Sequence, residues 1–381
     1  SVLSPAQIAE RLAEGTVFLA AGEVDRAPRQ RTIEAAIEWS YDLLSPTERI
    51  VFSRLAVFAG SFDIDAVTAV AGFDPVDDTE VLDAVTGLVE ASMLSVQADG
   101  PGPMRYRRLE ALRHFGASRL EESGDRTEAE RRHARYYLKL AEEAGHHRTT
   151  PEFASWMGRF EAARDELAPA LDWSLEHQAR ATTLRAIPGF LEYWQRRGDL
   201  DPAYRYGNRM LEGADNTAPE LRAYALMSAA FGAALTGDFE LAARAPLQAL
   251  QLAGETPGWQ CGLWARFTNG QIATILGDLE AVAAMGRAIL ELCDEYDLKL
   301  PRAYGVSLLA EAEFFADGDY AAARRFAEEA IAGFRGLYDI GGLKIYGLSI
   351  AAPVAALQGD LDAAEGYATE AITLPGAAWT A

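Results

Sequence analysis

The segment GDFELAARAPLQAL (Gly237–Leu250) returns as GDLEAVAAMGRAIL (Gly277–Leu290), with the same Gly-Asp start and the same spacing of small and branched aliphatic residues. Three further Gly-Asp dipeptides begin at Gly198, Gly318 and Gly359, so the five are separated by 39, 40, 41 and 41 residues. A fixed period of about 20–50 residues is typical of solenoids, whose units bury their apolar faces only against neighbouring units. This stretch therefore predicts an array of structural repeats.

Two further positions share the period. A compact apolar residue follows each Gly by five positions: Ala203, Ala242, Val282, Ala323 and Ala364. A branched aliphatic residue follows each Gly by thirteen positions: Leu211, Leu250, Leu290, Ile331 and Ile372. Gly can adopt the left-handed conformation that ends one helix, Asp can cap the next helix, and a small residue lets two helices approach closely. The pattern therefore predicts helix pairs with Gly-Asp at the turn between the two helices.

The repeat resembles the tetratricopeptide repeat (TPR). It has Gly-Asp at the inter-helix turn, Ala five residues after the Gly, and often a second Ala twelve residues after it, at Ala249, Ala330 and Ala371. The unit of about 40 residues is longer than the usual 34, which predicts first helices that are longer by a turn or two.

The N-terminal half carries different signals. Ser45-Pro-Thr-Glu48 is a capping box with Pro at the first helical position, which predicts a helix to about Phe58. Leu94–Gln97 and Met104–Arg107 alternate in polarity around the turn sequence ADGPGP, which predicts a β-hairpin. Further helices are predicted over 7–20, 32–44, after 63, over 79–91 and over 110–122, and every segment from 127 onward has a helical pattern. Helices followed by one hairpin and another helix describe a winged helix.

We therefore expect an all-α fold, in which a winged-helix domain with a small β-hairpin precedes a TPR-like α-solenoid. The winged helix is placed at residues 31–122 and the repeat array at 198–381. Residues 123–197 are expected to form a helical connector or degenerate repeats, without an evident flexible linker.

Composition limits the class of function. The 381 residues are 49% hydrophobic, which is enough for ordinary cores, and the net charge of −22 opposes general affinity for nucleic acid or anionic membranes. No apolar run reaches the roughly 18 residues that span a bilayer. The two cysteines, Cys261 and Cys293, indicate neither a disulfide scaffold nor a metal cluster. We expect a cytoplasmic location, no membrane contact, and a protein or small-molecule partner. Because the sequence starts without Met, we interpret it as a piece of a longer protein.

Four motifs in order resemble those of a known family: RQRTIEAAIEWSYDLLSPTERIVFSRLAVFAGSF (Arg29–Phe62), LVEASML, YRRLEALRHFGASRLEESG and RRHARYYLKLAEEA. With them the chain resembles the C-terminal half of actinobacterial STAND-type regulatory ATPases, the NB-ARC-like regulators of the SARP and LuxR types. The resemblance covers residues 7–180 by motif and the remainder by repeat architecture. It implies an upstream nucleotide-binding domain with 1–30 as its last helical region or linker, a winged helix that closes over the nucleotide, and an array that senses a ligand or partner.

The resemblance also implies residues that face the ATPase domain. In many NB-ARC proteins a Met-His-Asp motif after the wing contacts the nucleotide phosphate, and the matching residues here are Arg108, Leu109 and Glu110. Arg108, Arg29 and Arg31 are the candidates for this face, and the alternative is that they are solvated surface charges. A Walker A loop needs a Lys after Gly, and none of the three lysines follows a glycine. We therefore expect no cofactor in this chain, and ATP or ADP only in the upstream domain.

Five arginines surround the predicted wing: Arg105, Arg107, Arg108, Arg113 and Arg119. In DNA-binding winged helices the wing touches the phosphate backbone. The would-be recognition helix, however, presents Glu80, Asp83 and Glu90, whose charges repel phosphates. We expect no direct contact of this portion with nucleic acid, and contact with the ATPase domain or the repeats instead.

The first helix of each repeat carries a stripe of residues thirteen, ten, six and three positions before the Gly, which places them on one helix face. In TPR-like proteins this face lines a concave groove. Aromatic and polar residues dominate the stripe, with further aromatics along the same helices: Arg185, Glu192, Gln195, Tyr224, Met227, Phe231, Trp264, Phe267, Gln271, Tyr304, Phe315 and Tyr346. We predict that they bind a ligand or protein partner. The alternative is that the aromatic residues pack between neighbouring repeats.

No pattern predicts catalysis or metal binding. The five histidines are scattered, and the adjacent His146 and His147 do not place both rings on one metal. We therefore expect no catalytic and no metal-binding residue. The function that we predict is the non-catalytic sensor portion of a bacterial STAND-type transcriptional or signalling regulator. The alternative is a constitutive TPR-like scaffold for protein–protein interaction.

Overall fold

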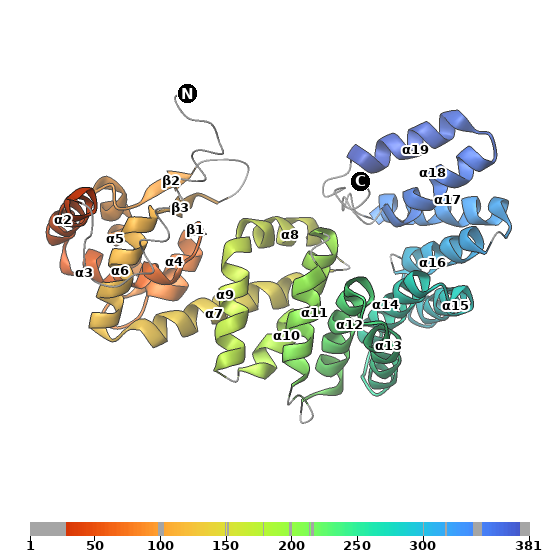
Figure 1. Cartoon of the computed structure of the whole chain (residues 1–381), viewed down its shortest axis with the longest axis horizontal. Helices are drawn as coiled ribbons and strands as arrows, with labels where there is room; N and C mark the ends of the chain where they lie inside the picture. Colours follow the sequence, from red (N-terminus) through yellow and green to blue (C-terminus); the bar gives the residue numbers. More distant parts are fainter. Residues whose placement is uncertain are drawn as a thin grey trace. The chain divides into compact units, whose positions relative to one another are not determined.

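The computed structural model describes residues 28–97, 103–148, 150, 152–177, 179–197, 200–212, 214, 217–299, 301–316, 318–337 and 345–373. These residues form helices and one small sheet (Figure 1). The chain divides into two compact units, the first comprising Ser1–Ala56 and Asp63–Arg126 and the second Val57–Phe62 and Thr127–Ala381. The helix expected over 7–20 lies outside the described residues.

The first unit has the element order of a winged helix. Its helices are α2 (Pro28–Asp42), α3 (Pro46–Arg54), α4 (Ile64–Ala71), α5 (Asp78–Glu90) and α6 (Glu110–Ser123). Strands β2 (Ser95–Gln97) and β3 (Arg105–Arg107) pair antiparallel, and Val96 opposes Tyr106. The predicted hairpin and helices are thereby confirmed. A short strand that the sequence did not predict, β1 (Phe62–Asp63), joins the sheet in the order β1-β3-β2.

The end of α3 differs from the prediction. The helix was expected to reach about Phe58, but it ends at Arg54, and the 3-10 turn η1 (Leu55–Val57) follows. This tighter turn places Leu55 and Ala56 in the core, where both are buried. Tertiary burial therefore overrides the continued helical pattern.

Capping explains where the helices of this unit begin. Ser45 Oγ accepts a hydrogen bond from the Glu48 N–H at 3.3 Å, and the Glu48 carboxylate accepts one from the Ser45 N–H at 2.7 Å, which completes the predicted capping box. Asp63 caps α4 through the Ala66 N–H at 2.9 Å. Asp77 starts α5 with a second capping box that the sequence analysis did not identify. Each such cap stabilises its helix by about 1 kcal/mol.

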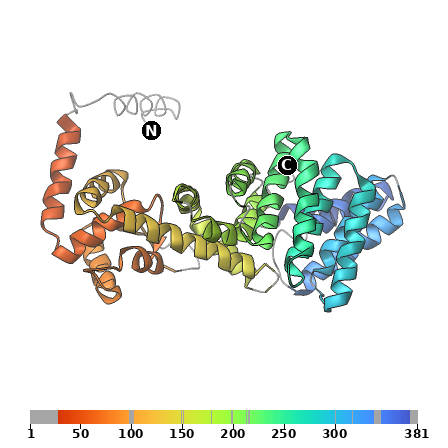
Figure 2. The same cartoon turned by 90° about the horizontal axis from the view of Figure 1, so that it is seen from below.

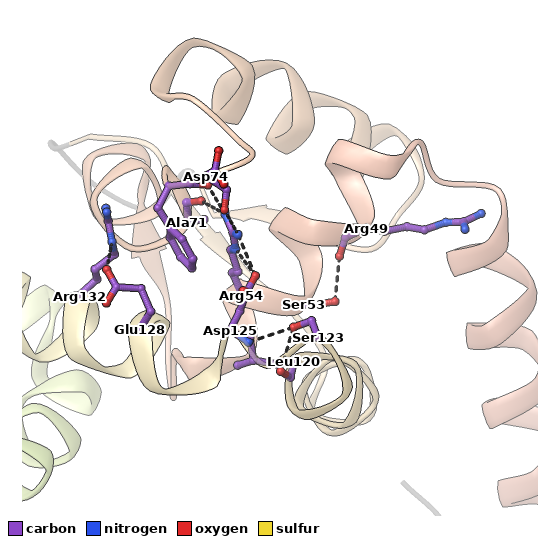
Figure 3. A network of polar contacts seen from close by, with 11 residues as sticks. Arg49, Ser53, Arg54, Ala71, Asp74, Leu120, Ser123, Asp125, Glu128 and Arg132 are labelled. Atoms are coloured by element: carbon purple, nitrogen blue, oxygen red, sulfur yellow. Dashed lines mark hydrogen bonds and ion pairs between the residues drawn. The ribbon is translucent and has the colours of Figure 1, made fainter.

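Arg54, which is fully buried, organises the turn between α4 and α5 (Figure 3). Its guanidinium donates to the carbonyl oxygens of Ala71 at 2.9 Å, Phe73 at 2.6 Å and Asp74 at 2.8 Å. It forms an ion pair with Asp125 at 2.8 Å, and its carbon lies 3.4 Å from the Phe73 ring centroid. A buried charge requires such partners, because its desolvation costs several kcal/mol. Arg54 therefore ties α3 to the α4–α5 turn and to the residues after α6.

The described elements of the second unit are helical, apart from Phe62, which is the first residue of β1. Helices α7 (Arg126–His146), α8 (Phe153–Ala162) and α9 (Arg164–Glu176) come first. Five helix pairs follow: α10 (Arg180–Arg197) with α11 (Leu200–Leu211), α12 (Pro219–Thr236) with α13 (Phe239–Gly254), α14 (Gln260–Leu276) with α15 (Leu279–Tyr296), α16 (Arg302–Phe315) with α17 (Tyr320–Leu337), and α18 (Ile345–Leu357) with α19 (Leu361–Thr373). This order confirms the predicted TPR-like region.

The pairs stack stepwise, as a solenoid requires. In the last four pairs each second helix packs on its own first helix, and α11, α13, α15 and α17 each also pack on the first helix of the following pair. The first helices α10, α12, α14, α16 and α18 also contact one another in that order. Figure 2 shows the green to blue helices of this unit packed side by side. Each pair therefore buries its apolar surface mainly against its neighbours.

The inter-helix turns have the predicted chemistry. Gly237, Gly277 and Gly359 have φ values of 91°, 79° and 81°, in the left-handed region. The Asp that follows each of them accepts a hydrogen bond from an N–H three residues later, as Asp238 does from Leu241 at 3.2 Å. Gly198-Asp199 lies outside the described residues. At these three turns the dipeptide therefore marks a left-handed helix end followed by an N-cap.

A buried carboxylate holds Val57–Phe62 in the second unit. Glu166 Oε1 accepts a hydrogen bond from the Gly60 N–H at 2.5 Å, and its Oε2 accepts one from the Ala59 N–H at 3.0 Å. The same Oε2 lies 2.7 Å from His133 Nε2. Glu166 is fully buried, so these three contacts replace its hydration.

Candidate binding site on the repeat array

The structure places most of the predicted aromatic stripe in the interior of the array. Six of its apolar side chains are buried: Tyr224, Met227, Phe231, Trp264, Phe267 and Tyr304. Tyr346 is half-buried, and Phe315 is 52% exposed. These six side chains are therefore packed inside the array, as in the alternative of packing between neighbouring repeats.

Edge-to-face contacts connect these rings across three repeats. The ring centroid of Tyr304 on α16 lies 5.1 Å from that of Trp264 and 4.7 Å from that of Phe267, both on α14. Phe267 continues the chain to Tyr346 on α18 at 5.3 Å, and Tyr304 continues it to Phe334 on α17 at 5.2 Å. Such pairs contribute about 0.5–1.5 kcal/mol each beyond the burial of their area. The rings thus stabilise the stacking of α14, α16 and α18.

One charged group lies among these aromatics. Arg148, just after α7, has its guanidinium carbon 3.6 Å from the Trp264 ring centroid and 5.9 Å from that of Tyr224. Its Nε lies 3.7 Å from Glu192 Oε2 on α10. The side chains of Arg148 and Glu192 are only 4% and 8% exposed. We call these four residues, Arg148, Glu192, Tyr224 and Trp264, the Arg148 cluster.

The Arg148 cluster is held by charge and stacking. Nε and Nη1 of Arg148 have no hydrogen-bond partner among the described residues, and 3.7 Å is longer than a hydrogen bond. A desolvated cation–π contact contributes about 2 kcal/mol, whereas removal of one partner of a buried ion pair costs about 3–5 kcal/mol. Desolvation raises the pKa of Tyr224 above its ordinary range, and the nearby Arg148 opposes this shift.

A second polar contact lies further along the same first helices. Thr274 Oγ1 on α14 donates a hydrogen bond of 2.8 Å to Glu311 Oε2 on α16. Burial of the carboxyl group raises the pKa of Glu311 to about 7, and the hydrogen bond from Thr274 opposes this shift. Neither residue was among the predicted site residues, although Thr274 stands three positions before Gly277, in the stripe. Arg148 was not among them either, because it follows α7 and has no counterpart in the repeat.

The remaining predicted groove residues are dispersed. Arg185 is exposed and forms an ion pair with Glu142 at 3.2 Å. Gln271 is partly buried, and its Oε1 has no hydrogen-bond partner among the described atoms. The side chain of Gln195 lies outside the described part of the chain. Among the predicted residues, the structure thus brings Glu192, Tyr224 and Trp264 together.

The residues predicted to face an ATPase domain are only partly described. The side chains of Arg29 and Arg31 lie outside the described part, although both residues are in α2. Arg108 is buried, and its guanidinium donates a hydrogen bond to the Leu55 carbonyl oxygen. The alternative that Arg108 is a solvated edge residue is therefore wrong, because its charged end lies within the winged helix.

The surface of the winged helix is electrostatically unlike a phosphate-binding surface. The exposed side of α5 carries four carboxylates and no basic residue: Asp78, Glu80, Asp83 and Glu90. Near the wing, Arg105 lies 4.0 Å from Asp63, and Arg113 pairs with Glu110 at 2.6 Å. Arg119 pairs with Glu122 at 2.8 Å and with Glu38 at 3.3 Å. The predicted basic cluster is thus largely neutralised by its own neighbours.

Both cysteines, Cys261 and Cys293, are buried. Burial raises the pKa of the Cys261 thiol to about 12 and that of Cys293 to about 11, so both thiols are protonated at neutral pH. In the described ranges, no three His, Cys, Asp or Glu residues come together in an arrangement that fits a metal ion. Within the same ranges, no helix combines the length and apolar character needed to cross a bilayer.

Comparison with known proteins supports the winged-helix assignment of the first unit. Residues 44–121 match the family described as Winged helix-turn-helix domain. A Mycobacterium tuberculosis protein with the provisional name of HTH-type transcriptional regulator is 36% identical over 213 residues, which are 55% of this chain and 24% of that protein. An uncharacterized M. tuberculosis protein is 37% identical over 125 residues, which are 32% of this chain and 31% of that protein. The chain thus spans about a quarter of the length of the regulator that it matches.

One solved structure was also matched over most of the chain. It is the STAND protein with a tetratricopeptide repeat sensor from Pyrococcus horikoshii, with a TM-score of 0.39 and 14% sequence identity. The likeness covers 92% of this chain and 59% of that protein. From its own elements and the domain match, the chain combines a winged helix-turn-helix domain with a TPR-like helical repeat region.

Proposed function

We propose that this chain is the non-catalytic sensor portion of a bacterial STAND-type transcriptional or signalling regulator in the cytoplasm. In this proposal the repeat array binds a ligand or protein partner, and binding controls an ATPase domain that is not part of this chain. ATP or ADP would be bound by that domain alone. Binding acts by shifting the population from a closed to an open state, which requires that the ligand prefer one of the two states.

The observation that carries the proposal is the extent of the similarity to the HTH-type regulator. The winged-helix match covers residues 44–121, which is 78 residues, whereas the identity of 36% extends over 213 residues. The similarity therefore reaches beyond the winged helix. The described winged helix and TPR-like region are consistent with a switch that joins a regulatory head to a sensor.

The winged helix in this proposal binds protein and not DNA. The four carboxylates on the exposed side of α5 repel phosphates, and three arginines on or near the wing, Arg105, Arg113 and Arg119, are paired with carboxylates of the same unit. Phosphate contacts by Lys and Arg supply most non-specific affinity for DNA, and this surface offers few free cations for them.

Nucleotide exchange in the full-length protein tests the proposal. Truncation after Leu211 removes the last four helix pairs and keeps α7–α9 and the first pair, so that Glu166 still holds Val57–Phe62. We expect the truncated protein to release nucleotide at least about tenfold faster, which corresponds to a barrier to release that is lower by about 1.4 kcal/mol. Equal release rates, with unchanged circular dichroism per residue, refute control by the array.

The buried aromatic stripe favours the constitutive scaffold as the second candidate. Rings that pack between repeats stabilise a rigid surface and need no ligand. A scaffold would capture the same protein partner in the presence and absence of nucleotide. A partner that binds only one nucleotide state supports the sensor instead.

A further inference from the structure

Three successive first helices converge on the guanidinium of Arg148. Glu192 comes from α10, Tyr224 from α12 and Trp264 from α14, and these helices are neighbours in the array. An aromatic face at 3.6 Å, a second ring at 5.9 Å and a carboxylate at 3.7 Å surround the cation. Aromatic rings and acidic groups in this arrangement recognise organic cations such as methylated ammonium groups. The array thus contains a cation-binding arrangement, and a residue from outside the repeats occupies it.

The way in which Arg148 is held makes it replaceable. Hydrogen bonds from Nε and Nη1 would fix the planar fork of an arginine, but neither atom has such a partner among the described residues. Stacking on Trp264 and attraction to Glu192 depend on charge and on a flat or methylated surface, which other organic cations also have. Replacement of Arg148 by such a cation therefore breaks no hydrogen bond of Nε or Nη1.

We propose that the Arg148 cluster is a binding site for an organic cation, a guanidinium or methylated ammonium group, and that Arg148 occupies it as an internal competitor. The ligand takes the position of the guanidinium over Trp264 and next to Glu192, and Arg148 leaves. Internal competition raises the apparent Kd by the inverse of the fraction of molecules in which Arg148 has left the site. This inference deepens the proposed sensing function. Only the consequence of binding rests on that function, and cation binding itself does not.

Removal of the competitor tests the site in the intact chain. Methylguanidinium and tetramethylammonium chloride serve as probes in ligand-observed NMR titrations. We expect Arg148→Ala to bind both probes saturably and at least about tenfold more tightly than the wild type, because each 1.4 kcal/mol of competition corresponds to a factor of ten. Arg131→Ala is the matched control, since Arg131 on α7 is exposed and pairs with Glu128 at 2.6 Å, and it should bind as the wild type does.

Double variants test whether the gain in cation affinity comes from the Arg148 cluster. Binding by Arg148→Ala should be lost when Trp264→Leu or Glu192→Gln is added. Equal affinity of wild type and Arg148→Ala, or binding that persists in both double variants, overturns the proposal. Binding of acetate to the wild type that disappears in Arg148→Ala also overturns it, because Arg148 would then be the receptor of an anion.

Two further measurements keep the test decisive. If Arg148→Ala does not fold, Arg148→Gln retains part of the aliphatic stem and should show the same gain. In the wild type, saturating tetramethylammonium should increase hydrogen exchange of the Arg148 amide, which now donates to the Gly145 carbonyl at 3.4 Å. Unchanged exchange at saturation overturns displacement. If the cation binds but does not alter nucleotide exchange of the full-length protein, the binding site is confirmed and the sensing function is refuted.

Discussion

At the residue scale, substitution of Trp264 tests whether the aromatic stripe has a structural role. Trp264 is buried, and its ring contacts Tyr304, Phe267 and Arg148. We expect Trp264→Ala to lower the free energy of unfolding by about 3–5 kcal/mol, measured by urea denaturation, because the truncation leaves a cavity. Phe315→Ala is the control from the same stripe, since Phe315 is 52% exposed, and should change stability by less than about 0.5 kcal/mol. An unchanged free energy for Trp264→Ala contradicts the packing role.

Glu311 should make stability depend on pH. Its folded-state pKa of about 7 lies above its ordinary value of 4.5, so between these values the unfolded chain loses the proton first. Ionisation therefore favours unfolding, and the contribution of Glu311 to stability falls as pH rises from about 4.5 to 7 and is constant above that range. The decrease is on the order of 3 kcal/mol, from about 1.4 kcal/mol per pK unit.

The measurement for Glu311 is a comparison with Glu311→Gln, which cannot ionise and retains an acceptor for Thr274. Urea denaturation at intervals from pH 4.5 to 8 gives the free energy of unfolding of both proteins. The stability of the wild type relative to the variant should fall with increasing pH. A constant difference across this range contradicts a raised pKa.

Some of the candidate site follows from the sequence, and some does not. The stripe spacing identified Glu192, Tyr224 and Trp264, because positions near multiples of the helical turn share a face in any helix pair. It did not show that their side chains turn inward, since burial depends on how closely the first helices approach. Arg148 could not be found by periodicity, because it lies in the connection after α7 and reaches residues 44 to 116 positions later only through the fold.

At the element scale, Gly232 sets the approach of α11 to α12. An added Cβ would lie 2.5 Å from the backbone nitrogen and the Cβ of Tyr204, so the helices would have to move apart. Gly232→Ala should lower the melting temperature, because overpacking costs about 1–3 kcal/mol and exceeds the gain in helix propensity of about 1 kcal/mol. Gly158→Ala in α8 is the control, since its Cβ would meet nothing within 4 Å, and should leave the melting temperature equal or higher. A stabilising Gly232→Ala contradicts the close approach.

Those features of the helices and strands that depend on neighbouring residues could be predicted from the sequence. The capping box at Ser45 and the Gly-Asp turns were predictable, because each is completed by atoms within a few residues. The short strand β1 was not, because two residues carry no alternation that a pattern could reveal. The role of Arg54 was also hidden, since its partners stand 17 to 71 positions away.

At the scale of the whole molecule, the solenoid architecture predicts a gradient of local stability. A helix in a stepwise stack is protected by its neighbours, so the free energy of local opening should follow burial. Helix α12 is buried along most of its length, with contacts to α10, α11, α13 and α14, whereas α19 has no buried residue and packs mainly on α18. We expect hydrogen exchange, followed by mass spectrometry, to be slowest in α12 and α14 and at least about a hundredfold faster in α19, which corresponds to about 2.7 kcal/mol. Gly232→Ala should accelerate exchange in α11 and α12 more than in α18 and α19, because the repeats are coupled through nearest neighbours. Equal protection of α12 and α19, or uniform acceleration by the variant, would mean that the array unfolds as one cooperative body and contradicts the stepwise stack.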